Sequence, residues 1–159
     1  MHSTRNDLAR TIRTKVIDLL DARLADAVDL QTQLKQAHWN FKGPTFIGLH
    51  ELFDKINEAV EDYVDDLAER VVQLGGVAHG TARQVAKAST LPEFPAVTGC
   101  HDHVVAVATV LAAFGKLARA GIDRADKLGD KDSADLFTEI SRGVDKWLWF
   151  VEAHLQAER

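Results

Sequence analysis

The sequence has 159 residues, enough for one domain with a substantial core but too few for two such domains. Its 46% hydrophobic and 27% charged residues are typical of a globular protein, and its formal charge of −5 argues against a general nucleic-acid binder. The single cysteine, Cys100, excludes an internal disulfide. No N-terminal apolar segment and no run approaching 18 apolar residues occurs, so we expect a cytoplasmic protein without signal peptide or membrane span.

Apolar residues recur at three- and four-residue steps over long stretches, which predicts helices, whereas strand patterns are sparse. The first predicted helix runs from about Asn6 to His38. A turn at Gly43-Pro44 follows it, and the second helix starts near Thr45 and stops at Gly75-Gly76.

A short helix is expected from Thr81 to Ser89, because Thr81 and Gln84 have the spacing of a capping box. The third long helix is predicted over about residues 98–128. The fourth is expected to begin with Asp132 as its cap.

Four long amphipathic helices, with one longer connection between the second and the third, predict an all-α protein. The expected architecture is a four-helix bundle with a crossover and a short extra helix in that connection. We expect one domain over residues 1–159, of which residues 1–6 form a flexible N-terminal arm.

The second helix presents two faces when its residues are placed at intervals of about 100°. An apolar stripe predicts the bundle core, and its members are Leu49, Phe53, Ile56, Val60, Tyr63, Leu67, Val71 and Leu74. A second stripe, on the flank and back of the helix, carries His50, Asp54, Asp65 and Glu69. It consists of two i,i+4 pairs that lie about 16 Å apart along the helix axis.

Each pair is expected to be half of a metal site, because ligand bonds of about 2 Å cannot span that separation. If the helix packed antiparallel against its copy in a second subunit, His50 and Asp54 would meet Asp65 and Glu69 of that subunit, and a twofold axis would create two identical sites. His38 could fold over the turn and join the first pair. Imidazole with carboxylate suits iron, manganese or zinc. Either pair alone is also typical of a solvated helix face, so that interpretation stays open.

The stretches HWNFKGPTFIGLHELFD and DYVDDLAERVVQLGG resemble the signature of the Dps proteins, the ferritin-like DNA-binding proteins from starved cells that are also called miniferritins. The likeness covers essentially the whole chain and extends to DKDSADLFTEISRGVDKWLWFVEAHL near its end. The family spacing H-x11-H-x3-D-x10-D-x3-E is met by His38, His50, Asp54, Asp65 and Glu69.

The resemblance implies a hollow dodecamer with ferroxidase centres at its twofold interfaces. One subunit would supply His38, His50 and Asp54, and its partner Asp65 and Glu69. Members oxidise Fe(II) with hydrogen peroxide or dioxygen and store ferric oxide in the cavity, which protects DNA from oxidative damage. Iron is therefore the expected metal, with zinc or manganese possible at the same site. The alternative is a nucleoid-binding or shell-forming protein with little ferroxidase activity.

Two further features match the family. Trp39 corresponds to an aromatic residue near the ferroxidase centre, where it would act as an electron donor or as an apolar plug at the interface. The acidic residues at the start of the fourth helix, Asp130, Asp135 and Glu139, correspond roughly to those of a threefold iron-entry pore. Acidic residues also complement the dipole at a helix N-terminus, so both interpretations stay open.

Two family patterns are missing. Ordinary ferritins carry E-x-x-H pairs in the bundle core, and no glutamate here has a histidine three residues later. Dps proteins that compact DNA carry a lysine-rich extension, whereas this chain opens with Arg5, Arg10, Arg13 and Lys15 against Asp7. Twelve copies at −5 each would carry −60, which disfavours the approach of phosphates. We expect weak DNA binding at most, and no membrane partner.

Overall fold

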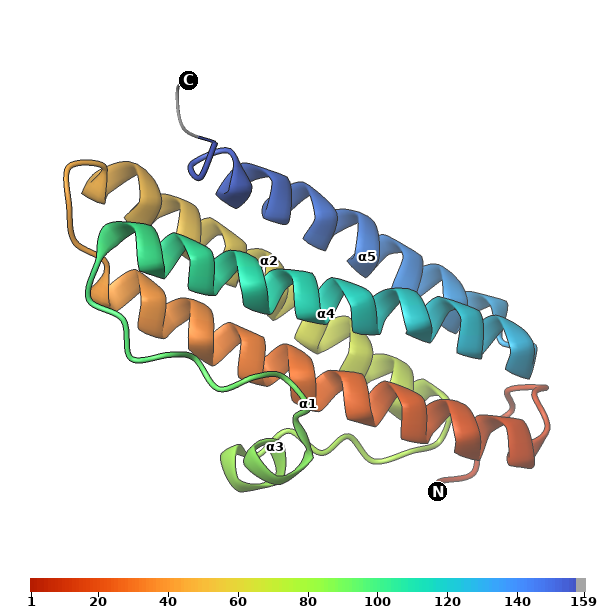
Figure 1. Ribbon diagram of the computed structural model, residues 1–159. Coiled ribbons are helices and arrows are strands. Elements are labelled where there is room, and N and C mark those ends of the chain that lie inside the picture. Colours follow the sequence, from red (N-terminus) through yellow and green to blue (C-terminus); the bar gives the residue numbers. More distant parts are fainter. Residues whose placement is uncertain (157–159) are drawn as a thin grey trace.

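Five helices make up the secondary structure of residues 1–156, the part of the chain that this computed structural model describes, and none of those residues lies in a strand. The helices are α1 (Arg10–Asn40), α2 (Phe46–Gln73), α3 (Ala82–Ala88), α4 (Cys100–Leu128) and α5 (Lys131–Glu152). Figure 1 shows the four long helices side by side, with the short α3 in the connection that crosses from α2 to α4. The predicted all-α bundle with a crossover and a short extra helix is confirmed.

Helix α1 begins at Arg10, later than predicted. The segment that precedes it lies against the C-terminal end of α2. The backbone N–H of His2 donates a hydrogen bond of 2.6 Å to the Gly75 carbonyl. The guanidinium of Arg13 donates to the Leu74 carbonyl at 2.9 Å. The start of α1 and the arm before it are therefore both bonded to the C-terminal end of α2.

The turn between α4 and α5 places a different cap on α5 than predicted. Gly129 ends α4 with a φ of 83°, a left-handed conformation that glycine adopts without steric cost. The helix then begins at Lys131, and the carboxylate of Asp130 accepts a hydrogen bond from the Ser133 N–H at 3.1 Å. The predicted cap at Asp132 is wrong, because Asp132 already lies in the first turn of α5.

The apolar stripe of α2 forms one wall of the core, against α1 and α5. Complete burial of each large apolar side chain contributes about 1.5–3 kcal/mol relative to exposure. Seven members of the stripe are at most 1% exposed: Leu49, Phe53, Ile56, Val60, Leu67, Val71 and Leu74. The packing fixes the rotation of α2 and leaves the stripe of histidine and carboxylates on its outer side.

Tyr63 is the half-buried member of that stripe, and Gly143 of α5 makes room for it. A Cβ atom at Gly143 would overlap the phenol hydroxyl. Burial raises the pKa of Tyr63 above its usual value of 10.0, and the Glu139 carboxylate raises it further. A hydrogen bond with Trp147 acts in the opposite direction, and the Asp62 carboxylate adds a small further rise.

Titration of the phenol checks this environment, because Tyr63 is the only tyrosine of the chain. We expect the absorbance of tyrosinate to appear with a midpoint above pH 10.0, and Glu139→Gln to lower that midpoint. Since the pKa is raised on folding, the neutral phenol stabilises the folded chain fully below pH 10.0, and this contribution is lost as the pH rises through the folded pKa. An unchanged midpoint in Glu139→Gln would show that the carboxylate does not act on the phenol.

By length and composition α4 could cross a membrane, although it contains no uninterrupted run of 18 apolar residues. Half of its most apolar 18-residue stretch is buried within the bundle, where α4 packs against α5 and α1. A long apolar helix of this kind is expected wherever a core helix is covered on several sides. The apolar character of α4 is thus explained by the core.

Buried polar side chains tie the connection between α3 and α4 to α1. Asp26 is fully buried, accepts a hydrogen bond from the Thr90 N–H at 2.6 Å and pairs with Arg23 at 2.7 Å. Gln33, which is 7% exposed, donates from Nε2 to the Pro92 carbonyl at 3.0 Å. These bonds hold the beginning of the connection on α1.

Candidate metal centre

His38 at the end of α1 and His50 near the start of α2 meet across the turn that joins the two helices. Their rings stack with centroids 3.7 Å apart and an interplanar angle of 19°. The ring of Phe46 also stacks against His50, at 4.9 Å. Gly43 in the turn has a φ of 139°, which side chains of L-residues rarely allow. The turn thus brings together two imidazoles that are twelve residues apart in sequence.

Reciprocal hydrogen bonds determine which nitrogen of each histidine is free. The Nδ1 atom of His38 lies 2.9 Å from the His50 carbonyl, and the Nδ1 atom of His50 lies 2.9 Å from the His38 carbonyl. A carbonyl oxygen can only accept, so each Nδ1 carries the proton and donates it. In the neutral tautomer that these bonds favour, the lone pair of each ring lies on Nε2, the nitrogen that could bind a metal ion.

Asp54 lies one turn beyond His50, and its carboxylate forms an ion pair with Lys35 of α1. The hydrogen bond from Lys35 lowers the pKa of Asp54 below its usual 3.8, against an opposing effect of burial. The carboxylate is therefore ionised at neutral pH and already neutralised by a cation. Lys35 was not among the predicted site residues, although its spacing of three residues from His38 places both on one face of α1.

Asp65 and Glu69, the other two predicted ligands, are exposed on α2. They belong to a part of the helix about 16 Å from the first pair. Within residues 1–156, no group of three or more histidine, cysteine, aspartate or glutamate side chains is arranged to hold a metal ion. A single chain therefore brings His38 and His50 together but keeps Asp65 and Glu69 apart from them.

The outer face of α2 is symmetric about the midpoint of the helix. His50 and Glu69 are equidistant from that midpoint, which lies midway along Phe46–Gln73, and so are Asp54 and Asp65. Two copies of α2 that cross antiparallel at their midpoints would therefore place His50 opposite Glu69 and Asp54 opposite Asp65 of the partner. Two i,i+4 pairs always share one centre, but nothing in their spacing requires that centre to coincide with the midpoint of the helix.

Other side chains of this face obey the same symmetry. Ile47 and Val72 are equidistant from the midpoint, and they are 63% and 53% exposed. Exposed apolar side chains at matched positions are typical of an interface between copies of a chain. Glu58 and Glu61 are also equidistant from the midpoint, and both are exposed in the single chain.

Hollows lie beside both half-sites. One of about 420 Å³ is lined by Glu69 together with Val72 and Ala78, among others. A second, of about 490 Å³, is lined in part by Lys35 and Trp39. Trp39 is 69% exposed and lies beside His38, a position that suits either an electron donor or an apolar plug.

The acidic residues at the start of α5 have different surroundings. Asp130 is 2% exposed and accepts a 2.8 Å hydrogen bond from Arg70, while its other oxygen accepts from the Ser133 hydroxyl at 2.6 Å. Asp135 and Glu139 are exposed on α5. Both oxygens of Asp130 are thus engaged within the chain, and of the three predicted pore residues only Asp135 and Glu139 are exposed.

Known proteins resemble this chain over nearly its whole length. A family model described as a ferritin-like domain matches residues 17–159. The chain is 43% identical over 156 residues to the DNA protection during starvation protein of Agrobacterium fabrum, covering 98% of this chain and 96% of the relative. A protein of the same name from Mycolicibacterium smegmatis is 35% identical over 143 residues, which are 89% of this chain and 78% of that protein.

Solved structures agree with the sequence comparison. Dps of Mycobacterium smegmatis superposes with a TM-score of 0.93 at 33% identity, over 99% of this chain and 90% of that chain. DpsC from Streptomyces coelicolor gives the same TM-score of 0.93 at 30% identity, over 99% of this chain and 92% of that chain. The likeness therefore extends over nearly the whole chain in both sequence and fold.

Proposed function

The chain belongs to the Dps family of ferritin-like proteins, and from this membership we propose that it oxidises and stores iron at centres formed between two subunits. Hydrogen peroxide or dioxygen is the electron acceptor, and ferric oxide is deposited in a hollow dodecamer. DNA is protected because both reagents of hydroxyl-radical production are consumed. The protein acts in the cytoplasm, where it associates with the nucleoid weakly at most.

The arrangement of ligands about the midpoint of α2 carries this proposal. A complete centre would take His38, His50 and Asp54 from one subunit and Asp65 and Glu69 from its partner, so the dimer would contain two identical centres. The free Nε2 atoms of the two histidines supply neutral nitrogen ligands. Three carboxylates supply negative charge, and such a mixed set suits iron and also accepts zinc or manganese.

The side chains bind Fe(II) as the substrate of the reaction. One molecule of hydrogen peroxide takes one electron from each of two Fe(II) ions, its O–O bond breaks, and two hydroxide and two Fe(III) ions result. Fe(II) that binds the Asp54 oxygen paired with Lys35 would displace the ammonium of that lysine. We propose that Lys35 thereby keeps Asp54 ionised and oriented until the metal arrives.

Entry of iron and supply of electrons involve further residues. We propose that Asp135 and Glu139 line an acidic threefold pore that concentrates cations, since repeated carboxylates focus the electric field. Asp130 contributes to the structure of this region through its bonds with Arg70 and Ser133 and is not proposed as a pore ligand. Trp39 is proposed as an electron donor to the centre or as an apolar cover of the interface.

Anaerobic addition of Fe(II) followed by hydrogen peroxide tests the function. We expect ferric absorbance to develop rapidly in the natural protein and only at the uncatalysed rate in the triple variant His38→Ala, His50→Ala, Asp65→Ala. Asp66→Ala is the matched control, because Asp66 is an exposed carboxylate next to Asp65 but off the ligand face. Its rate should equal that of the natural protein.

Two outcomes would contradict the proposal. Equal rates in the natural protein and the triple variant would exclude the predicted ligands. A DNA mobility shift on the same preparation addresses the alternative of a nucleoid-binding or shell-forming protein. Tight binding that weakens steeply with salt, without iron oxidation, would favour that alternative.

A further inference from the structure

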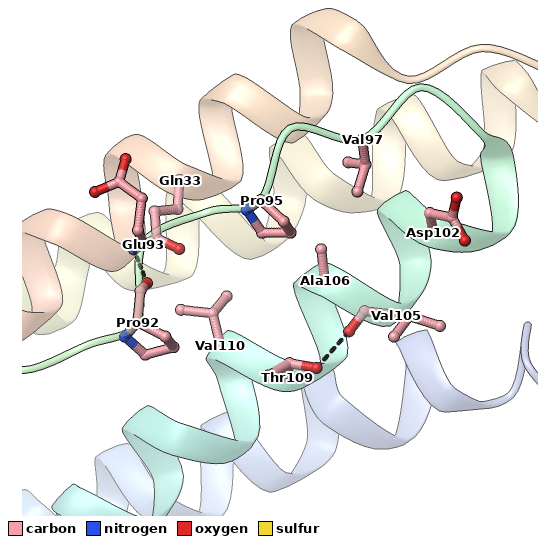
Figure 2. Close-up of a pocket in the computed structure, with 10 residues that line it drawn as sticks. All are labelled: Gln33, Pro92, Glu93, Pro95, Val97, Asp102, Val105, Ala106, Thr109 and Val110. Atoms are coloured by element: carbon pink, nitrogen blue, oxygen red, sulfur yellow. Dashed lines mark hydrogen bonds between the residues drawn. The ribbon is translucent and has the colours of Figure 1, made fainter.

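A pocket of about 420 Å³ opens between α4 and the connection that precedes it, and none of the proposed metal ligands lines it (Figure 2). The volume is within the range of pockets that hold small organic ligands. Its apolar walls come from Pro92, Pro95 and Val97 of the connection and from Val105, Ala106 and Val110 of α4.

Gln33 of α1 reaches this pocket with a hydrogen-bond acceptor that has no partner. The side chain is 7% exposed, and its Nε2 donates to the Asp29 carboxylate at 3.1 Å and to the Pro92 carbonyl at 3.0 Å. Because both partners can only accept, the orientation of the amide is determined. The buried Oε1 atom has no hydrogen-bond partner, and Figure 2 shows it turned from Pro92 toward the side of Pro95 and Val110.

The remaining polar groups of the pocket also offer acceptors. The Thr109 hydroxyl donates its proton to the Val105 carbonyl at 2.8 Å, so its unused capacity is that of an acceptor. The carboxylates of Glu93 and Asp102 lie at opposite ends of the pocket (Figure 2). Among the described residues that line the pocket, none has a cationic side chain.

We propose that this pocket binds a small organic cation with an apolar body and a protonated amine. The apolar body packs between the proline and valine walls, and the ammonium donates a hydrogen bond to Gln33 Oε1. Glu93 and Asp102 attract the positive charge from the two ends of the pocket, and the walls of low polarity strengthen their field. An anionic ligand would meet two carboxylates and no cationic side chain.

The proposal is independent of iron oxidation, because none of the pocket residues is a ligand of the proposed centre. Its failure would leave the ferroxidase proposal unchanged, and the reverse is also true. Each variant of the pocket is therefore assayed for iron oxidation as well, and the rate is expected to equal that of the natural protein.

The test is calorimetric titration of the full chain with tryptamine, with tryptophol and indole-3-propionate as neutral and anionic probes of similar shape. We expect tryptamine to bind at least about 10-fold more tightly than either, because only it offers a charged donor. Removing both carboxylate charges with Glu93→Gln and Asp102→Asn should weaken tryptamine binding by roughly 3–10-fold. Val105→Trp should abolish binding by filling the pocket, and the exposed position of Val105 allows this change.

Three results would overturn the proposal. Tryptamine does not bind the natural protein below about 10 mM, an affinity weaker than about −3 kcal/mol. Alternatively, all three probes bind equally, so that charge and donor do not matter. Finally, Val105→Trp binds tryptamine as tightly as the natural protein does, which would place the ligand elsewhere.

Discussion

Replacing Asp65 and Glu69 together by alanine is expected to slow peroxide-dependent iron oxidation by at least about 100-fold, and replacing His50 and Asp54 should do the same. Each double variant removes one half of every centre, because each proposed centre takes one ligand pair from each subunit. Ligand residues should matter at least as much as their supporting neighbours, whose loss alone costs about 10–100-fold. The measurement is the initial rate of ferric absorbance after addition of hydrogen peroxide.

Co-assembly of the two double variants distinguishes a shared centre from one within a single chain. In a mixed dimer, one centre would combine both defective halves, and the other would combine both intact halves. Random pairing makes about half of the dimers mixed, so about a quarter of the natural rate should return. If each centre lay within one chain, every chain would remain defective and mixing would restore nothing.

Two controls make this result interpretable. Light scattering must show that each double variant still assembles, because loss of the interface would also remove activity. Mixing of preassembled variants without dissociation should leave the rate low, since subunits cannot then exchange. Recovery without dissociation would contradict the shared centre.

Replacing Asp130 by alanine is expected to be the most destabilising change among the acidic residues of α5. The substitution removes the cap of the helix, which costs about 1 kcal/mol. It also leaves the guanidinium of Arg70, whose side chain is 12% exposed, without its partner at 2.8 Å. Breaking a buried ion pair in this way costs about 3–5 kcal/mol, which for a chain of this size lowers the Tm by roughly 10 °C.

The chain offers matched controls for this prediction. Asp132 is 84% exposed and lies 3.6 Å from the same Arg70 group, so Asp132→Ala should change stability by less than about 1 kcal/mol. Asp130→Asn keeps one oxygen for the Ser133 N–H but loses the charge and the second oxygen, which accepts from the Ser133 hydroxyl, so its stability should fall between the two. Thermal unfolding at one protein concentration is the measurement, because assembly adds to the apparent stability.

The opposite result would indicate that Asp130 belongs to the proposed pore. If Asp130→Ala kept its stability but slowed iron uptake, its carboxylate would act on iron and not on Arg70. Asp135→Ala with Glu139→Ala should instead keep its stability and slow uptake, because both side chains are exposed. The comparison separates a structural carboxylate from carboxylates that guide cations.

The sequence by itself determined the four long helices, the core stripe of α2 and the outer face that carries the ligand pairs. These features depend on periodicity and turn residues, which act over a few positions along the chain. The same local rules predicted the capping box at Thr81 and Gln84, which the structure confirms. Placing His50 and Asp54 on one face needed only the geometry of a helix.

Only the tertiary structure decided which atoms of those side chains are available. The lone pairs on Nε2 of His38 and His50 follow from carbonyl contacts across a turn. The Asp130 carboxylate accepts a hydrogen bond from Arg70, which lies sixty residues earlier in sequence. Gln33 borders its pocket because the connection that contains Pro92 lies against α1. Such contacts depend on how separate helices pack, a property that no local pattern contains, because the partner lies far away along the chain.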